Sequence, residues 1–261
     1  KITDCINYGE VVNNASTSTA KADGNRESVG GITSSCEDVA GVVISGCSNY
    51  GTIVLNNPEA EYVGGIIAVP NGPVAANSAD NYAGTNKISI KNCTNYGAIV
   101  LQRAAKPSAG GIVGCLCAAN VEGCTNLGTI SSVAASELKA GGLVGKFFKG
   151  AACSLINCTN GESGSSATKG VITSSTGTAS AYIGGILGNI PAAAAGKLTI
   201  SGCKNYADIS TDNAYAGNIG GFGSYWNAQN CVVEVSDCDN YGNVSNTTTT
   251  DAGDNKIGGF V

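Results

Sequence analysis

The side chains that could perform catalysis are few and scattered along this sequence. Histidine is absent from the 261 residues, so no imidazole can act as a general base or bind a metal. The acidic residues remain as candidates, because hydrolysis of a glycosidic bond needs two carboxyl groups about 5–9.5 Å apart. Asp208 and Asp212 stand four residues apart, and Asp237 and Asp239 flank Cys238. None of these pairs forms an array along the chain, so we do not expect an enzyme.

Aromatic side chains beside amides indicate a different chemistry, the binding of sugar rings, because an aromatic ring is a platform for a ligand. Trp226 is the only tryptophan; it follows Tyr225 and precedes Asn227, and Tyr215 lies shortly before them. We take these four residues as a candidate ligand-binding site. The alternative interpretation is that Trp226 is a hydrophobic cap over the edge of the core.

The composition argues against several other ligands. The net charge is −5 and the chain has two arginines, so a partner with a phosphate backbone, such as nucleic acid, is not expected. No apolar run approaches the ~18–20 residues of a membrane-spanning helix. The cysteines lack the paired Cys-x2-Cys spacing of zinc sites. We therefore expect neither a metal nor another cofactor.

Two motifs alternate along the chain, and they determine the structural elements that would position the candidate acidic and aromatic residues. The motif Cys-x-Asn occurs seven times, with its cysteines at Cys5, Cys47, Cys93, Cys124, Cys158, Cys203 and Cys238, and its asparagines at Asn7, Asn49, Asn95, Asn126, Asn160, Asn205 and Asn240. A Gly-Gly pair follows each copy before the next begins, as at Gly110-Gly111. The shortest step between successive motif cysteines is 31 residues. The sequence is therefore about seven copies of one unit.

Each unit contains the pattern of short β-strands. Alternating apolar residues before the cysteine, such as Ile88 and Ile90, predict one strand. A second strand is predicted around the apolar residue that stands six positions after the cysteine, and a third is predicted to begin at Gly-Gly. We predict an all-β fold, a parallel β-helix or β-solenoid of about seven three-stranded coils, in a single repeat domain over residues 1–261. A seven-bladed β-propeller is the alternative, although its blades need about 40–50 residues.

In a solenoid, a residue that recurs once in each coil stacks on its own copies. The asparagines would form a ladder of side-chain amides in a tight corner, and the motif cysteines a ladder of buried free thiols. Glycines two residues after the asparagines can adopt positive φ, although Ala207 at that position in the sixth copy shows that not every coil requires it. Cys153, Cys115 and Cys117 are expected in the core. A tyrosine beside the asparagine would form a stripe that either packs at the corner or binds a partner: Tyr8, Tyr50, Tyr96, Tyr206 and Tyr241.

The repeat is interrupted in three places, and such loops often carry binding functions. The interruptions cover residues 13–28, 68–87 and 160–170. The second of them contains Tyr82, which we add to the candidate ligand-binding residues.

Several segments resemble the GLUG-type repeat of bacterial surface proteins. They are Gly-Gly-Ile-Val-Gly at residues 110–114 with Cys-Thr-Asn-Leu-Gly-Thr-Ile at 124–130, and Gly-Gly-Leu-Val-Gly at 141–145 with Asn-Cys-Thr-Asn at 157–160. The resemblance covers nearly the whole chain, with departures in the first two copies. It implies a surface-exposed, non-catalytic module of large exported proteins, including those of gut commensals.

Together these patterns predict an extracellular or cell-surface module of a bacterial protein that binds a glycan or a surface protein in the manner of an adhesin. The chain contains no methionine, so we expect a fragment of a longer chain with flanking domains. Two alternatives stay open at this point: a polysaccharide-processing β-helix enzyme and a purely structural stalk.

Overall fold

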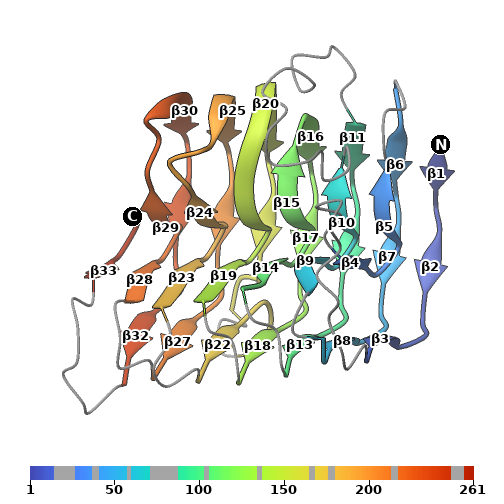
Figure 1. Ribbon diagram of the computed structural model, residues 1–261, viewed down its shortest axis with the longest axis horizontal. Helices are drawn as coiled ribbons and strands as arrows, with labels where there is room; N and C mark the ends of the chain where they lie inside the picture. The colour runs from blue at the N-terminus through green and yellow to red at the C-terminus, as the bar shows by residue number, and fades with distance from the viewer. Residues whose placement is uncertain are drawn as a thin grey trace, which may run out of the picture.

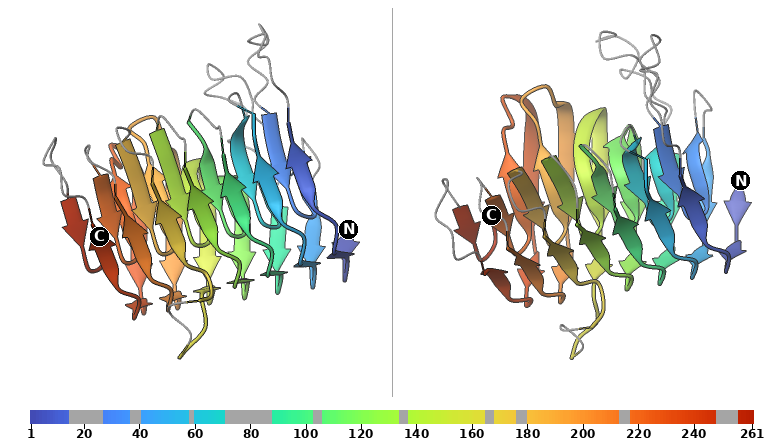
Figure 2. Two further views of the ribbon diagram at one scale, coloured as in Figure 1. Left: turned by 90° about the horizontal axis from the view of Figure 1, so that it is seen from below. Right: turned by 60° about the horizontal axis from the view of Figure 1, so that its bottom comes forward.

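A computed structural model describes residues 1–14, 27–36, 41–57, 60–70, 88–102, 106–133, 137–164, 168–175, 180–212, 217–247 and 256–261. In these residues, strands of successive coils pair in parallel and form four sheets. Figure 1 shows the coils side by side from the amino-terminal to the carboxy-terminal end, and Figure 2 shows the same stacking from two further directions. The prediction of an all-β parallel β-solenoid of about seven coils is confirmed. The propeller is excluded, because propeller blades are antiparallel sheets.

The four sheets are named A to D. Sheet A contains twelve strands: β1 (Ile2–Thr3), β5 (Thr33–Cys36), β6 (Val43–Ser45), β10 (Ile67–Pro70), β11 (Ile88–Lys91), β15 (Val113–Cys117), β16 (Ala119–Glu122), β20 (Val144–Ile156), β24 (Leu187–Ile190), β25 (Ala195–Ser201), β29 (Gly223–Trp226) and β30 (Asn230–Ser236). Sheet B contains β2 (Ile6–Asn7), β7 (Ser48–Asn49), β12 (Thr94–Asn95), β17 (Thr125–Asn126), β21 (Thr159–Asn160), β26 (Lys204–Asn205) and β31 (Asp239–Asn240).

The other two sheets also contain one strand from each of the seven coils. Sheet C contains β3 (Val11–Asn13), β8 (Ile53–Leu55), β13 (Ile99–Leu101), β18 (Ile130–Ser132), β22 (Ile172–Ser174), β27 (Ile209–Thr211) and β32 (Val244–Asn246). Sheet D contains β4 (Glu27–Gly30), β9 (Ala60–Gly64), β14 (Ser108–Gly110), β19 (Glu137–Gly141), β23 (Ser180–Gly184), β28 (Gly217–Gly220) and β33 (Lys256–Gly258).

A coil has more strands than the three we predicted. The run from β11 to β15 visits sheets A, B, C and D and returns to A, so it contains five short strands. The two residues after each motif cysteine, the second of which is the ladder asparagine, form a strand of their own, and another strand ends at the first glycine of Gly-Gly. The long strand β20 joins the outgoing and returning parts of sheet A.

Equivalent positions of successive coils pair with one another. Asn95 pairs with Asn49 and with Asn126, and Gly110 pairs with Gly64 and Gly141. The step between coils varies from 31 to 46 residues, yet this register is kept. Extra residues therefore leave the coil between strands without disturbing the ladders.

Two hydrophobic cores fill the solenoid. One lies between the outgoing and returning strands of sheet A and contains Ile90, Val113 and Phe147. The other lies between sheets C and D and contains Ile99, Leu138 and other residues of those sheets. Between the two cores the cross-section narrows, and a Cβ on the second glycine of each of the first six Gly-Gly pairs would collide with an asparagine of the ladder there.

The asparagine ladder is continuous through all seven coils. In the first six coils the asparagine Nδ2 donates to the Oδ1 of the next coil at 2.8–2.9 Å, and also to the carbonyl of a nearby glycine or alanine. Asn49, Asn95, Asn126, Asn160 and Asn205 are completely buried. The amides thus satisfy their hydrogen bonds inside the protein, which is what makes their burial tolerable.

The turns differ from our expectation. The ladder asparagines lie in strands, and the left-handed corner is instead the residue just before each motif cysteine, with φ of 52–65° at Asp4, Gly46, Asn92, Gly123, Asn157, Gly202 and Asp237. Gly51 and Gly97 are absent from the residues with positive φ. Glycine is required at these positions because there is no space for a side chain. A Cβ on Gly51 would lie 1.9 Å from the carbonyl oxygen of Gly9.

All twelve cysteines lie in the described residues, and all are free thiols. The five inner motif cysteines (Cys47, Cys93, Cys124, Cys158 and Cys203) are buried, as predicted, whereas Cys5 in the first coil is exposed and Cys238 in the last is half-buried. Cys153, Cys115 and Cys117 are also buried. Cys115 and Cys117 belong to a small apolar cluster with Tyr62 that is separate from the main cores, with their Sγ atoms 3.7 Å apart.

We expect thiol labelling to reflect this burial. Eight of the twelve thiols are buried, so the native protein should accept at most four iodoacetamide adducts. Cys5 should react first, because its thiol is exposed. Burial raises the pKa of the Cys36 and Cys231 thiols, so their reactive thiolate fraction stays low until the pH rises. Mass spectrometry of native and denatured samples measures the adducts; rapid labelling of Cys124 in the native protein would contradict the buried ladder.

Candidate functional site

An exposed stack of tyrosines runs along the solenoid directly after the strands of sheet B. The Tyr8 and Tyr50 rings lie 5.2 Å apart with an interplanar angle of 17°, and Tyr50 and Tyr96 lie 4.3 Å apart at 3°. All three are exposed. The parallel register of sheet B places one ring per coil at about the 4.8 Å strand spacing, so adjacent rings stack face to face. The predicted aromatic stripe is therefore present.

The stack is interrupted in the fourth and fifth coils. Leu127 and Gly161 occupy the tyrosine position there, and the stack resumes with Tyr206 and Tyr241, whose rings are 4.9 Å apart at 8°. Tyr206 therefore has one ring face on Tyr241, and its other face points toward the fifth coil, where Gly161 offers no side chain.

A local insertion follows Gly161 in the fifth coil. In the fourth coil the Nδ2 of Asn126 bonds the carbonyl oxygen two residues later, but in the fifth coil Asn160 bonds the carbonyl of Gly170, ten residues later. The coil thus contains eight extra residues. Gly161 and Gly164 both have positive φ, near 80°, where a side chain would be strained.

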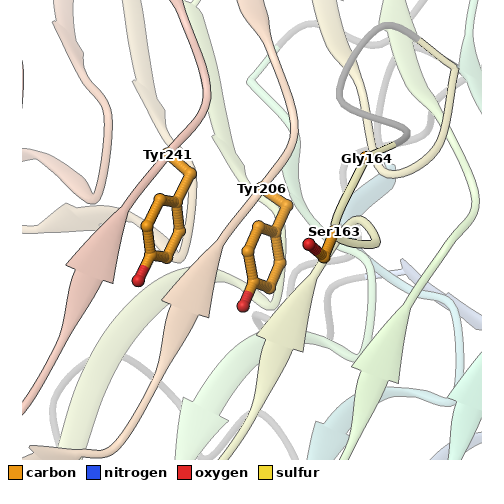
Figure 3. Close-up of a pocket in the computed structure, with 4 residues that line it drawn as sticks. All are labelled: Ser163, Gly164, Tyr206 and Tyr241. Carbon is orange, nitrogen blue, oxygen red and sulfur yellow. The ribbon is translucent and has the colours of Figure 1, made fainter.

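The insertion and the second tyrosine stack line an open surface pocket of about 400 Å³. Figure 3 shows its four lining residues: Ser163 and Gly164 from the inserted segment, and the parallel rings of Tyr206 and Tyr241 from the last two coils. We call it the coil-five pocket. It offers aromatic surface, a serine hydroxyl and backbone groups, and none of its four lining residues carries a carboxyl group.

A hydrogen bond and a neighbouring ion pair fix the position of Tyr241, which lines the coil-five pocket. The hydroxyl of Tyr241 donates to Asp239 Oδ2 at 3.2 Å, and Lys204 Nζ lies 3.6 Å from the same carboxylate oxygen. The negative charge of Asp239 raises the pKa of Tyr241, so the phenol stays protonated. The ring orientation is therefore set by its neighbours.

The structure separates Tyr225 and Trp226, two of the four aromatic residues of the predicted ligand-binding site. Trp226 packs against the main core, and its Nε1 is buried without a hydrogen-bond partner among the described residues. Tyr225 points to the opposite side of β29, where Asn227 Nδ2 donates to its hydroxyl at 3.3 Å and the Tyr182 ring lies 5.4 Å away. This arrangement matches the interpretation of Trp226 as a cap over the core. Tyr215 and Tyr82 lie outside the described residues.

The arrangement in the coil-five pocket follows from two sequence features that we noted separately. One is the interruption at 160–170, and the other is the tyrosine stripe. Only the fold shows that Ser163 and Gly164 of the first feature lie beside Tyr206 and Tyr241 of the second.

Comparison with known proteins gives one match, to a solved structure. It is described as a putative immunoglobulin A1 protease from Bacteroides ovatus, with 16% sequence identity and a TM-score of 0.46. The alignment covers 98% of this chain and 77% of that one. No protein-family model matches the sequence. No curated protein matches it.

Within the described ranges, no group of three or more histidine, cysteine or acidic side chains is arranged to hold a metal ion. In the same part of the chain, no helix has the length and hydrophobicity that crossing a membrane requires.

Proposed function

We propose that this chain is a non-catalytic, extracellular module of a bacterial surface protein and that it binds a glycan in the coil-five pocket, as an adhesin does. The observation that carries the proposal is the interrupted tyrosine stack, which leaves a ring face of Tyr206 beside a pocket. The resemblance to GLUG-type repeats supports the surface location.

The pocket suits a saccharide in shape and chemistry. Its volume of about 400 Å³ lies within the range of about 300–1,000 Å³ that small-molecule sites have. A pyranose ring presents an apolar face that packs on Tyr206 in place of the missing ring of the fifth coil. Its hydroxyl groups then meet the Ser163 hydroxyl and the backbone at Gly164, which give hydrogen bonds and specificity.

None of the four described residues that line the coil-five pocket carries a carboxyl group, and this agrees with a binding role. Glycoside hydrolysis needs an acid and a second carboxylate on either side of the scissile bond. Asp239, the carboxylate nearest in the chain to Tyr241, is engaged by Lys204 and by the Tyr241 hydroxyl.

The two tyrosine stacks of the same molecule make a matched test. We expect Tyr206→Ala to weaken glycan binding by about tenfold or more, because it removes the ring on which the sugar packs. Tyr50→Ala removes a ring that is stacked on both faces, by Tyr8 and Tyr96, and that has no inserted segment beside it among the described residues, so it should leave the affinity unchanged. Binding to an array of mucin, plant and host-matrix glycans identifies the ligand, and calorimetry measures the three affinities.

The test can also go against the proposal. Equal losses in Tyr206→Ala and Tyr50→Ala would show that the stripe as a whole, and not the coil-five pocket, binds the ligand. Binding of no glycan by the unmodified protein would overturn the proposal and favour the structural stalk.

A further inference from the structure

A second group of polar and aromatic side chains lies on the outside of the solenoid, where sheet D turns into the returning part of sheet A. On β19 and β23, Leu138, Ala140, Ala181 and Ile183 pack inside. Since side chains alternate along a strand, Lys139 and Tyr182 point outward. These two residues pair in register on adjacent coils.

The returning part of sheet A repeats this arrangement. Phe147, Ile190 and Trp226 pack in the main core, so their neighbours Lys146, Asn189 and Tyr225 point outward. These three pair in register on the consecutive strands β20, β24 and β29. We call Lys139, Lys146, Tyr182, Asn189 and Tyr225 together the Lys–Asn–Tyr cluster.

The two rows of the cluster face each other. The Tyr182 ring of sheet D lies 5.4 Å from the Tyr225 ring of sheet A, tilted by 46°. The Lys146 ammonium of sheet A lies 5.2 Å from the centre of the Tyr62 ring, which is on the adjoining part of sheet D. The cluster is therefore one continuous surface built from two sheets.

The cluster carries positive charge in a protein whose net charge is −5. Lys139 is paired with Glu137. Within the described residues, however, no ion pair joins Lys146 to a carboxylate; its ammonium instead lies over the rings of Tyr62 and Phe148, at 5.2 and 4.8 Å. Lys149 adds a further cation beside Phe148. Lys146 is thus available to an anionic group.

Asn189 provides a second, independent observation. Its side chain is 3% exposed, and its Nδ2 donates to the Tyr225 carbonyl at 3.4 Å. Its Oδ1 is buried and has no hydrogen-bond partner among the described residues. Buried polar atoms are seldom left unpaired in native proteins, and those that are call for an explanation such as a ligand. A hydroxyl group of a ligand would satisfy this oxygen.

We propose that the Lys–Asn–Tyr cluster binds a negatively charged saccharide. Lys146 pairs with the acidic group, and Asn189 Oδ1 accepts a hydrogen bond from a sugar hydroxyl. Tyr182 and Tyr225 contact the sugar ring. Tyr225 is exposed, and a change in the orientation of its side chain gives the sugar hydroxyl access to Asn189. This site is separate from the coil-five pocket and does not depend on it.

Trigalacturonate and its fully methyl-esterified form are the first pair of probes, because esterification removes the charge and adds only one methyl group to each carboxyl group. A sulfated oligosaccharide of the same length distinguishes a carboxylate from a sulfate ligand. We expect at least one of the two acids to bind and the ester not to bind, as measured by calorimetry. Lys146→Gln should weaken binding of the acid at least fivefold, and so should Asn189→Asp, which places a negative charge at the same position.

Lys197→Gln is the matched control, since Lys197 is a half-buried lysine already paired with Glu234. This control and Tyr206→Ala should both keep the affinity for the acid, which separates this site from the coil-five pocket. Thermal unfolding checks that each variant is folded. The proposal is overturned if neither acid binds at millimolar concentration, if the ester binds equally well, or if Lys146→Gln has the affinity of Lys197→Gln.

Discussion

Replacing the central asparagine of the ladder, Asn126→Ala, should lower the free energy of unfolding by about 3–5 kcal/mol. The Asn126 amide makes three hydrogen bonds: from Nδ2 to Asn160 Oδ1 at 2.8 Å and to the Gly128 carbonyl at 3.0 Å, and at Oδ1 from Asn95 Nδ2 at 2.9 Å. Alanine leaves the Asn160 oxygen and the Gly128 carbonyl without these donors inside the protein. Each buried group without a partner costs about 1–3 kcal/mol.

The first rung of the same ladder is the control. Asn7 is only partly buried, because no coil precedes it in the structure, so water can hydrate the groups that Asn7→Ala exposes. We expect a loss of about 1 kcal/mol for this variant. Urea unfolding followed by circular dichroism compares the two. Equal losses would mean that burial of the ladder contributes little to stability.

A methyl group on the second glycine of a central Gly-Gly pair should be at least as damaging. In Gly142→Ala the new Cβ would lie 2.1 Å from the Gly185 carbonyl oxygen and 2.2 Å from Cγ of Asn160. Both neighbours are fixed, one by backbone pairing and one by the ladder. We expect a loss of about 3 kcal/mol or more, because the coil must shift to admit the methyl group.

Gly259 holds the same position in the last coil, where no atom lies within 4 Å of an added Cβ. Gly259→Ala should therefore change the free energy of unfolding by less than about 0.5 kcal/mol. The same unfolding experiment measures both variants. A low soluble yield of Gly142→Ala, together with a normal yield of Gly259→Ala, would also agree with the expectation. If both alanines were tolerated alike, close packing of Gly-Gly on the asparagines would not be a requirement of the fold.

The ladders could be predicted from the sequence because they depend on single positions. Cys-x-Asn recurs once in each copy, and any parallel stacking of copies brings Asn95 beside Asn126. The left-handed corner also had a sequence signal, since Asp, Asn or Gly precedes every motif cysteine, and these are the residues that enter that region most readily. We predicted the corner at the asparagine that follows the cysteine, and this is three residues later in the chain than the observed corner.

The rest depends on contacts between segments that are far apart in the coil. Gly65 and Asn95 belong to different copies, and their contact at the narrow part of the cross-section follows only from the completed fold. The outward positions of the Lys–Asn–Tyr cluster lie two residues before and four residues after Gly-Gly. Their side chains change from coil to coil while the inner positions stay apolar, a signal that is visible once the inward and outward faces are known.

The asparagine ladder also has a direction. In all six of its amide-to-amide hydrogen bonds the donor belongs to the earlier coil and the acceptor to the later one. The amide dipoles therefore add along the long axis, with oxygen toward the first coil and N–H toward the last, much as peptide dipoles add in a helix. Hydrogen bonds in such a chain polarise one another, so each amide in the middle is held more strongly than one at either end. The solenoid consequently has an electrical polarity along its axis that is independent of its charged residues.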